Sequence, residues 1–361
     1  ARILILDEPT AVLTPQESES LFATLSQMVA AGLAIVFISH KLDEVLRVSQ
    51  RIAVLRGGKL VAVLPADGAD KAMLAEAMVG RRVAPAVKQA REPGPVVAAL
   101  HGVGVAAQAG GGRPRLADLN LALRAGEVLA VAGVAGNGQQ ALAELLCGEL
   151  APDAGTLTLD GQALPARPRE WVRAGVARIP EDRHAVGVVG DLPLWENACL
   201  ERYADAPFSR HGLVDGRRAR AHAAALVQRF DVRGTEGAGL DTVTRALSGG
   251  NMQKLILGRA LAGNPDDPRP PRLIIANQPT WGLDIGAVAY VHQQLLDAAA
   301  AGAAVLLISE DLDEIFALAD RIAVMHHGRL GTARPRADWT LAAIGLAMAG
   351  ATANPEVAHA A

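Results

Sequence analysis

The segment Leu247-Ser248-Gly249-Gly250-Asn251 places a hydroxyl and two glycines at the start of an apolar-periodic stretch that runs to Leu261. Apolar residues at this spacing predict a helix that begins at the glycines. The first N–H groups of a helix have no partner within it, and they carry the positive end of the helix dipole. Ser248, Gly249 and Gly250 are therefore predicted to offer a hydroxyl and N–H donors to an anion.

A second glycine-rich segment, residues 133–140, follows the apolar run Val128–Val131 and precedes another helical pattern. It has the spacing of the phosphate-binding loop GxxxxGK[ST], and its glycines are Gly133, Gly136 and Gly138. Gln139 stands where this pattern has lysine, and Gln140 stands where it has serine or threonine. The cation for the phosphates and the hydroxyl for Mg²⁺ are therefore missing. Taken alone, the segment is also compatible with a plain tight turn between a strand and a helix.

The sequence contains an internal repeat. Residues 2–60 match residues 272–330 at a constant offset of 270 without a gap, and 21 of the 59 positions are identical. Repeats of this kind usually fold alike, which predicts two related domains. Only the second copy is preceded by a glycine-rich loop, so we interpret the sequence as part of a longer two-domain polypeptide. The predicted organisation is the end of a first domain at 1–80, a linker at 81–95, a second domain at 96–350 and a disordered tail at 351–361.

Short apolar runs alternate with helical patterns in both copies. Runs of this length between turn residues are typical of buried parallel strands, and they lie at Ile3–Leu6, Ile35–Ile38, Val128–Val131, Leu273–Ala276 and Val305–Ile308. Helical patterns lie between them, as at Glu17–Ala30 and Val288–Ala300. This alternation predicts an α/β fold with a parallel sheet, and residues 192–262 predict a mostly helical insert.

The composition excludes several classes of function. Lys+Arg number 35 and Asp+Glu 38, a net charge of −3, so no nucleic-acid partner is expected. The two cysteines, Cys147 and Cys199, are too few for a disulfide scaffold or a cysteine-rich zinc site, and they fit a reducing compartment. No apolar run reaches the roughly 18 residues of a membrane span, and no export signal is expected.

The segment at 247–251 resembles the LSGGQ signature of ABC-transporter ATPases, here written LSGGN. Residues 6–10, LDEPT, resemble the Walker B segment of the same family. The resemblance implies that Asp7 holds Mg²⁺ through water, that Glu8 orients and deprotonates the attacking water, and that His40 contacts the γ-phosphate of ATP. It covers nearly the whole chain and implies the ABC ATPase fold: a P-loop-like parallel sheet flanked by helices, with an antiparallel β part and a helical subdomain.

The second copy departs from the family at each matching position. The departures are Asn277 for Asp7, Gln278 for Glu8 and Glu310 for His40. An amide neither acts as a base nor carries charge for a metal, and a carboxylate beside phosphate is repulsive. Glu181 stands where the family has a glutamine that senses the γ-phosphate, whereas Asp284 keeps the family's D-loop pattern.

Paired domains of this family lie head to tail, so each ATP is held between the phosphate loop of one domain and the signature of the other. The resemblance therefore implies that Ser248, Gly249 and Gly250 complete the site of Asp7, Glu8 and His40. This gives one competent composite site and one degenerate site, the latter formed by residues 133–140, Asn277 and Gln278. The chain by itself is expected to hydrolyse no ATP at a useful rate, because the loop that serves Asp7 is missing.

The resemblance points to the ATP-binding subunit of bacterial importers for nucleosides or simple sugars, with ATP and Mg²⁺ as cofactors. It implies transmembrane permease subunits as partners, a periplasmic or lipid-anchored solute-binding protein as an indirect partner, and a peripheral place on the cytoplasmic face of the inner membrane. The strings GVAGNGQ, IPEDRH and ISEDLDEI favour the nucleoside branch over the monosaccharide branch. Two alternatives stay open: a soluble ABC ATPase that acts on ribosomes or DNA-repair complexes, and an inactive fragment.

Overall fold

The structure is a computed structural model. It describes residues 2–350 except 11, 12, 14, 40, 57, 81, 83–85, 90, 108–112, 264, 267 and 268. His40 and the predicted tail at 351–361 therefore lie outside the described residues. The chain divides into two compact units: unit 1 comprises Ala1–Ala86 and Leu283–Tyr290, and unit 2 comprises Val87–Gly282 and Val291–Ala361. Each unit is described by itself.

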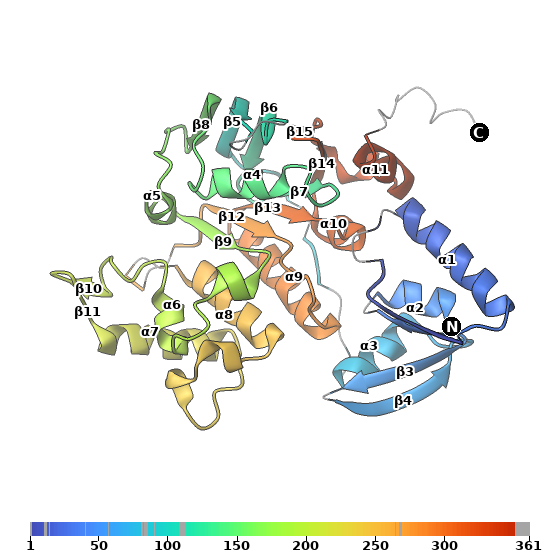
Figure 1. The fold of residues 1–361 in the computed structure, drawn as a ribbon. Helices are drawn as coiled ribbons and strands as arrows, with labels where there is room; N and C mark the ends of the chain where they lie inside the picture. The colour runs from blue at the N-terminus through green and yellow to red at the C-terminus, as the bar shows by residue number, and fades with distance from the viewer. Residues whose placement is uncertain are drawn as a thin grey trace. The chain divides into compact units, whose positions relative to one another are not determined.

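Unit 2 is built on a sheet of order β15-β14-β7-β13-β12-β9 (Figure 1). Its parallel strands are β9 (Val176–Ile179), β12 (Leu273–Asn277), β13 (Ala304–Ser309), β7 (Val128–Ala132) and β14 (Arg321–His326). Every residue of β7, β12 and β13 is buried. Continuous apolar runs are expected in a parallel sheet that is covered on both faces, and the predicted parallel sheet is confirmed. Two short strands, β15 (Arg329–Leu330) and β16 (Arg334–Pro335), pair antiparallel with β14.

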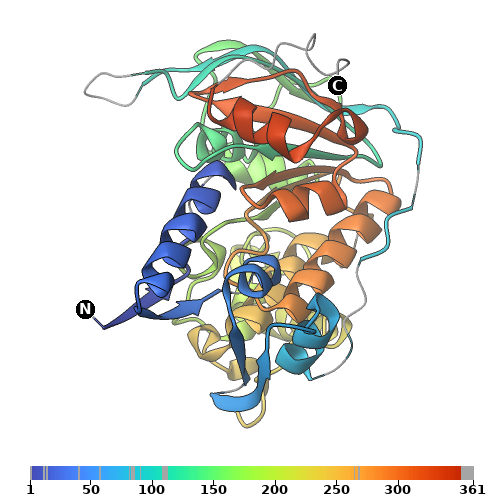
Figure 2. The ribbon, with the colours of Figure 1, turned by 90° about the vertical axis from the view of Figure 1, so that its right-hand side faces the viewer.

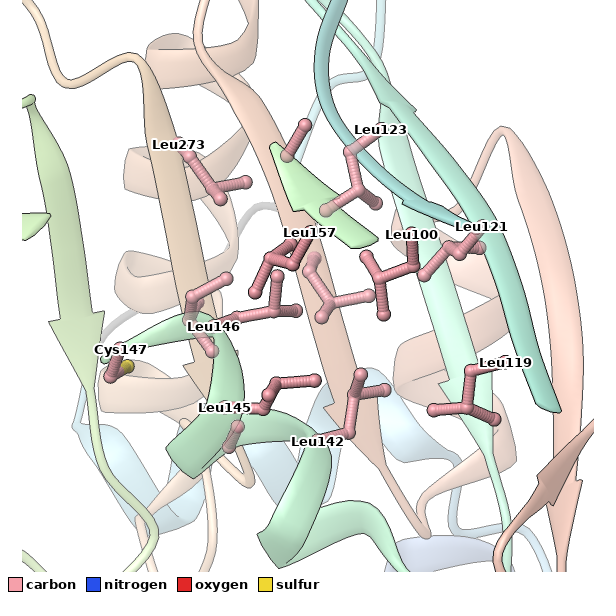
Figure 3. Close-up of a cluster of buried hydrophobic side chains, with 14 of the residues drawn as sticks. Leu100, Leu119, Leu121, Leu123, Leu142, Leu145, Leu146, Cys147, Leu157 and Leu273 are labelled. Atoms are coloured by element: carbon pink, nitrogen blue, oxygen red, sulfur yellow. The ribbon is translucent and has the colours of Figure 1, made fainter. Parts of the chain in front are cut away.

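One face of this sheet is covered by helix α4 (Gln139–Leu146) and by an antiparallel sheet of order β6-β5-β8. The strands of that second sheet are β5 (Val96–Val105), β6 (Leu116–Arg124) and β8 (Ala154–Leu159). Figure 3 shows Leu142, Leu145 and Leu146 of α4 in one buried apolar cluster with Leu100 of β5 and Leu273 of β12. This packing fixes the start of α4, and therefore the glycine-rich loop before it, relative to the strand ends.

Helices α9 (Ile285–Ala300) and α10 (Leu312–Leu318) lie on the other side of the parallel sheet (Figures 1 and 2). The part of α9 from Val291 onward belongs to unit 2 and buries Val291 and Leu295, and α10 buries Ile315 and Leu318. The remaining helices outside the insert are α5 (Pro168–Arg173), α11 (Leu341–Met348) and the short turns η1 (Arg183–Gly187) and η4 (Arg336–Asp338).

The predicted insert is mostly helical. It contains α6 (Leu194–Cys199), α7 (Gly216–Arg229), α8 (Gly249–Ala262), the 3-10 turns η2 (Gly239–Asp241) and η3 (Thr244–Ala246), and one small hairpin of β10 (Ser209–Arg210) and β11 (Leu213–Val214). Buried Asn197 links its parts, because its side-chain amide donates to the Thr244 hydroxyl at 2.9 Å and accepts the Val189 N–H at 2.8 Å. Together with the two sheets, this insert completes the predicted fold class.

Unit 1 contains β1 (Ile3–Asp7), α1 (Pro15–Ala30), β2 (Ala34–Ile38), α2 (Leu42–Val48), β3 (Arg51–Arg56), β4 (Lys59–Pro65) and α3 (Lys71–Val79). β1 pairs in parallel with β2, and β3 forms a hairpin with β4. Exposed and half-buried residues alternate along β1 and β2, so this two-stranded sheet buries only one face. Buried Phe22 of α1 packs edge to face on Phe37 of β2, with ring centres 6.1 Å apart.

Among the described residues, no helix combines the length and the apolar character that a membrane crossing requires.

Candidate functional site

Ser248 lies at the N-cap of α8 with an exposed side chain, whereas the neighbouring Leu247 is buried. The Ser248 hydroxyl makes no capping bond to the helix; it accepts the Asn251 side-chain amide at 2.9 Å. Asn251 is itself fixed, because its side-chain oxygen accepts the Arg233 N–H at 2.9 Å. The first N–H groups of this 14-residue helix, at Gly249 and Gly250, thus lie at a partly exposed surface that suits an anion.

The segment after β9 packs against the signature. It begins with Glu181 and Asp182 and continues into the π-helical turn η1. The Asp182 carboxylate accepts the N–H groups of His184 and Ala185 at 2.9 and 2.8 Å. These backbone hydrogen bonds, that of Ala185 above all, lower the pKa of Asp182, so it stays ionised at neutral pH.

Arg183 joins this turn to the loop after β12. Its guanidinium donates to the Trp281 carbonyl at 2.7 Å and to the Gly282 carbonyl at 3.3 Å. A Cβ at Gly249 would lie 3.4 Å from the same guanidinium, so Arg183 lies close to the start of α8. Burial lowers the pKa of Arg183, which nevertheless remains a cation. Sequence reasoning gave Arg183 no role of its own, because nothing in its spacing indicates a bond to residues about 100 positions away.

The glycine-rich loop before α4 is closed by its own side chains. Gly136 and Gly138 have φ angles of +81° and +116°, a region that favours glycine. The side-chain amides of Asn137 and Gln139 both donate to the Val134 carbonyl, at 2.9 and 2.8 Å. A Cβ at Gly133 would lie 2.5 Å from the Gln139 amide nitrogen, so the absence of a side chain there leaves room for this amide.

A chain of polar contacts runs from the antiparallel sheet to the end of β12. Arg115 donates to Glu144 at 2.5 Å, and the Gln140 side-chain amide donates to the other Glu144 oxygen at 3.0 Å. The Asn277 amide then donates to the Gln140 side-chain oxygen at 3.0 Å. The structure therefore brings Gln140 and Asn277 together, as two neutral amides bonded to one another. Arg115 and Glu144 were missed in the sequence, where both are ordinary surface residue types.

Gln278 and Glu310 lie side by side at the ends of β12 and β13. Gln278 has a φ of +47°, its N–H donates to the Ile308 carbonyl at 2.8 Å, and its side-chain oxygen lies 3.4 Å from the Glu310 N–H. Behind them, buried Glu314 accepts the Thr280 hydroxyl at 2.8 Å and lies 3.0 Å from the His292 ring nitrogen. These contacts hold the strand ends without any metal-binding carboxylate at position 277 or 278.

A cavity of about 290 Å³ opens beside this strand edge. Gln140 and Asn277 line it together with charged groups, which are Glu144, Glu149, Arg178, Glu181 and Asp182. Arg178 forms an ion pair with Glu149, so the charge that is left on the wall is negative. Burial raises the pKa of the Cys147 thiol, which also lines the cavity, to about 12. This thiol is therefore protonated at neutral pH and is no nucleophile.

In unit 1, Asp7 ends β1 with an exposed side chain, and Glu8 follows with a φ of +48°. The Glu8 N–H donates to the Ile38 carbonyl at 2.9 Å, which ties the acidic pair to the end of β2. Buried Thr10 donates its hydroxyl to Glu44 at 2.6 Å. The structure thus places both predicted carboxylates at one strand end.

Asp284 begins α9, where its carboxylate accepts the Ala287 N–H at 2.9 Å. This hydrogen bond is a helix N-cap, and it fixes the position of Asp284, which matches the D-loop pattern.

Comparison with known proteins bears on this arrangement. A family model described as ABC transporter matches residues 116–267. The glucose import ATP-binding protein TsgD13 of Haloferax volcanii is 43% identical, over 98% of this chain and 64% of that protein. The nucleoside import ATP-binding protein NupA of Lactococcus lactis is 40% identical, over 98% of this chain and 68% of that protein.

The chain belongs to the ABC transporter ATP-binding protein family. It spans 64% of the length of the Haloferax relative and 67% of the guanosine import ATP-binding protein NupO of Bacillus subtilis, to which it is 42% identical. A solved nucleotide-free ATP-binding cassette from an ABC transporter covers 67% of this chain with a TM-score of 0.54 at 19% identity, over 92% of its own length. At that identity the likeness concerns the fold, and it confirms the predicted ATP-binding cassette architecture.

The residues at the ends of β1 and β12 can be compared with the phosphate and metal ligands that such a site requires. The pattern GxxxxGK[ST] holds phosphate through its glycines and lysine, and carboxylate oxygens are the ligands that Mg²⁺ prefers. Unit 2 has the loop and the strand, but it carries amides at positions 139, 140, 277 and 278. Unit 1 carries the acidic pair, and the exposed Asp7 carboxylate is an oxygen donor of the kind that Mg²⁺ prefers.

Proposed function

We propose that this chain is the larger part of an ATP-binding subunit that energises an ABC importer for nucleosides or simple sugars. Relatives from three organisms, 40–43% identical, are import ATP-binding proteins for glucose, nucleosides and guanosine. In this proposal the protein hydrolyses ATP at one composite site and keeps a second, degenerate site. The predicted boundaries, a first domain to residue 80 and a second from residue 96 to 350, are part of the same proposal.

A single observation carries the assignment of the competent site. Glu8 and Gln278 hold the same backbone geometry, with φ angles of +48° and +47° and one N–H bond each to the neighbouring strand. Only Glu8 carries a group that can accept a proton from water, since an amide has no basic site at neutral pH. Hydrolysis is therefore assigned to the acidic pair of unit 1.

Each residue of the composite site has a distinct task. Asp7 would hold Mg²⁺ through water, and the metal would offset negative charge on the phosphates. Glu8 orients the attacking water and takes its proton, and His40 contacts the γ-phosphate. Ser248, Gly249 and Gly250 present the positive end of α8 to the same phosphate from the other domain.

ATP acts in this mechanism through its preference for the closed pair of domains. Closure moves the region around residues 183–197, which contains η1 and the start of α6, against cytoplasmic loops of a transmembrane permease. The subunit would then lie on the cytoplasmic face of the membrane as a peripheral partner of that permease. A solute-binding protein outside the membrane delivers the nucleoside or sugar.

Transport by the complete importer tests this proposal. The complete polypeptide is assembled with the permease encoded beside it in proteoliposomes that contain ATP, and uptake of labelled guanosine, adenosine, ribose and glucose is measured with the solute-binding protein outside. We expect ATP-dependent uptake of one of these solutes. Absence of a permease partner, with recovery of the protein on ribosomes instead, would support a soluble ABC ATPase and overturn the proposal.

The chain printed here offers a second, simpler test. Its sequence contains no GxxxxGK[ST] motif, so the acidic pair has no lysine-bearing loop to hold the phosphates. Phosphate release from purified chain and Mg²⁺·ATP is therefore expected to equal that of a sample without protein. Release well above this background would show that another group in the chain supplies the missing cation.

A further inference from the structure

The metal position of the degenerate site is filled by a directional chain of hydrogen bonds. Arg115 can only donate, so it fixes Glu144 as an acceptor at 2.5 Å. Glu144 in turn requires the NH₂ end of the Gln140 amide, which lies 3.0 Å away. The Gln140 oxygen must then face Asn277, whose NH₂ group donates to it at 3.0 Å. One arginine thereby sets the orientation of both amides.

This orientation does not fit Mg²⁺. A phosphate loop of the usual type offers Mg²⁺ a hydroxyl oxygen from the position of Gln140, and the strand end offers a carboxylate from the position of Asn277. Here the Gln140 oxygen is already occupied, and the Asn277 amide points its hydrogens along the line between the two side chains. Neither residue carries negative charge. The donor set and its polarity both disfavour a divalent cation.

The phosphate position of the loop is filled in the same way. Gln139 is 8% exposed, its amide nitrogen donates to the Val134 carbonyl, and its side-chain oxygen is buried without a hydrogen-bond partner. Where a lysine would place a cation, this residue places an unpaired acceptor, which repels phosphate oxygens. Asn137 adds a second amide bond to the Val134 carbonyl, and its side-chain oxygen accepts the His327 N–H at 2.8 Å.

The surrounding cavity does not compensate for the missing cation. Its charged lining comprises four carboxylates and one guanidinium. That guanidinium is paired with Glu149 and Glu144 is paired with Arg115, so Glu181 and Asp182 supply the negative charge of the wall. The ATP anion would therefore enter a site of its own sign with neither lysine nor metal to offset the repulsion.

We propose that the second phosphate loop is self-occupied. The amides of Asn137, Gln139 and Gln140 hold the loop and the end of β12 in place of a Mg²⁺-nucleotide, and the site binds none. Unit 2 then keeps the signature helix ordered without a ligand of its own. This last role rests on the proposed function, whereas the exclusion of Mg²⁺·ATP concerns unit 2 alone.

Binding of Mn²⁺·ATP to the purified chain tests the proposal, with free Mn²⁺ measured by electron paramagnetic resonance. All samples carry Asp7→Asn and Glu8→Gln, so that the acidic pair of unit 1 contributes no carboxylate to metal binding. We expect no loss of free Mn²⁺ signal beyond the loss that ATP alone causes, and no rise in Tm with Mg²⁺·ATP. The combined variant Gln139→Lys, Gln140→Ser and Asn277→Asp restores the missing groups, and we expect it to bind Mn²⁺·ATP at least 10-fold more tightly than its parent.

Two further variants keep the test decisive. Gln228→Lys, on the exposed face of α7, adds the positive charge of Gln139→Lys far along the chain from the loop and is expected to leave Mn²⁺·ATP unbound. Asn277→Asp alone, a change of similar shape, is expected to gain weak Mn²⁺ binding even if the combined variant fails to fold. Stoichiometric Mn²⁺·ATP binding by the parent, or no gain by Asn277→Asp, would overturn the proposal. Solute uptake by the complete importer does not depend on either result, so the two proposals can fail separately.

Discussion

The strand ends of the two copies share one backbone arrangement and differ in charge. Glu8 and Gln278 have nearly equal φ angles, and their N–H groups donate to the neighbouring strand at 2.9 and 2.8 Å. The threonine two residues on donates to a glutamate in both copies, at 2.6 Å in unit 1 and 2.8 Å in unit 2. The backbone arrangement that positions the Glu8 carboxylate is thus present in unit 2, where Gln278 replaces that carboxylate.

The backbone arrangement and its hydrogen bonds are therefore kept in unit 2 independently of the carboxylate at position 8. The threonine–glutamate pair belongs to the identical positions of the repeat, as do the proline after each strand and the serine at the end of the next. These residues hold two strand ends and a loop together, which unit 2 still needs to keep α8 and its signature in place. The residues that changed, at 277, 278 and 310, are those that would face a nucleotide.

The same two strand pairs also differ in burial. Ile3 and Ile5 of β1 are 62% and 66% exposed, whereas their counterparts in β12, Leu273 and Ile275, lie in the main apolar cluster of unit 2. In unit 2 that cluster contains residues of α4 and of the antiparallel sheet, and the described residues of unit 1 form no counterparts of these elements. The apolar residues of β1 therefore have the pattern of a strand that packs in a core, although Ile3 and Ile5 are exposed in this chain.

A lysine at the matched positions gives the largest expected difference. Ile275→Lys places an unpaired charge in a closed core, which costs several kcal/mol and is expected to unfold unit 2. Ile5→Lys changes an exposed residue, and the free energy of unfolding should change by no more than about 0.5 kcal/mol. Circular dichroism melts and limited proteolysis of the two variants measure the contrast. An equal loss in both would show that the β1 face is covered.

The acidic pair gives the next largest effect. In the complete polypeptide with its permease, Glu8→Gln is expected to lower ATP turnover at least about 100-fold, because the general base is lost. Gln278→Ala, at the same backbone position of the other copy, is expected to change turnover less than twofold. Steady-state phosphate release at saturating ATP measures both. Comparable losses in the two variants would remove the asymmetry between the sites.

Much of this arrangement can be predicted from the sequence, because it depends on local patterns. The buried strand Leu273–Asn277 is a continuous apolar run, and α8 begins where glycines and a serine precede apolar periodicity. The repeat adds the second strand pair without further assumptions. The loss of carboxylates in unit 2 is also readable, since an amide and a carboxylate differ in the sequence itself.

The contacts that close the degenerate site could not be predicted in this way. Arg115, the α4 residues Gln140 and Glu144, and Asn277 come from three separate parts of the chain, and their hydrogen bonds depend on rotamers that periodicity does not encode. One signal in the sequence pointed to the contact between Gln140 and Asn277, because these two neutral amides replace two groups that bind the same metal. The link from Arg183 to the Trp281 carbonyl has no comparable signal, because any donor could serve a carbonyl acceptor.

Removal of the buried glutamate tests whether the shared scaffold is equally important in both copies. Glu314 is 3% exposed and contacts Thr280 and His292, whereas in the other copy the position that matches His292 is Phe22, which offers Glu44 no ring nitrogen. Glu314→Ala leaves the half-buried Thr280 hydroxyl and His292 ring without this acceptor and is expected to cost about 2–4 kcal/mol.

Glu44→Ala removes the acceptor of the buried Thr10 hydroxyl and of the Ser39 hydroxyl, but the Glu44 side chain is 13% exposed, so water can replace part of these bonds and about 1 kcal/mol is expected. Urea unfolding followed by hydrogen exchange separates the two units and measures each loss. Glu314→Gln serves as the matched control, since it keeps an acceptor oxygen and should recover part of the stability. A smaller loss for Glu314→Ala than for Glu44→Ala would contradict the ranking.

The smallest expected effect concerns the helices that follow β2 and β13. Asp311 caps α10 by accepting the N–H groups of Asp313 and Glu314 at 2.9 and 3.3 Å. Lys41 occupies the same position before α2, and its side chain makes no capping bond. Asp311→Ala is therefore expected to lower the free energy of unfolding by about 1 kcal/mol, because two helix N–H groups lose their acceptor.

Lys41→Ala should leave the stability of unit 1 unchanged, and the reverse change, Lys41→Asp, should raise it by a few tenths of a kcal/mol to about 1 kcal/mol. Hydrogen exchange at the first turns of α2 and α10 measures these shifts directly. A stabilising effect of Lys41→Asp would show that unit 1 retains a backbone able to accept the cap that unit 2 already uses.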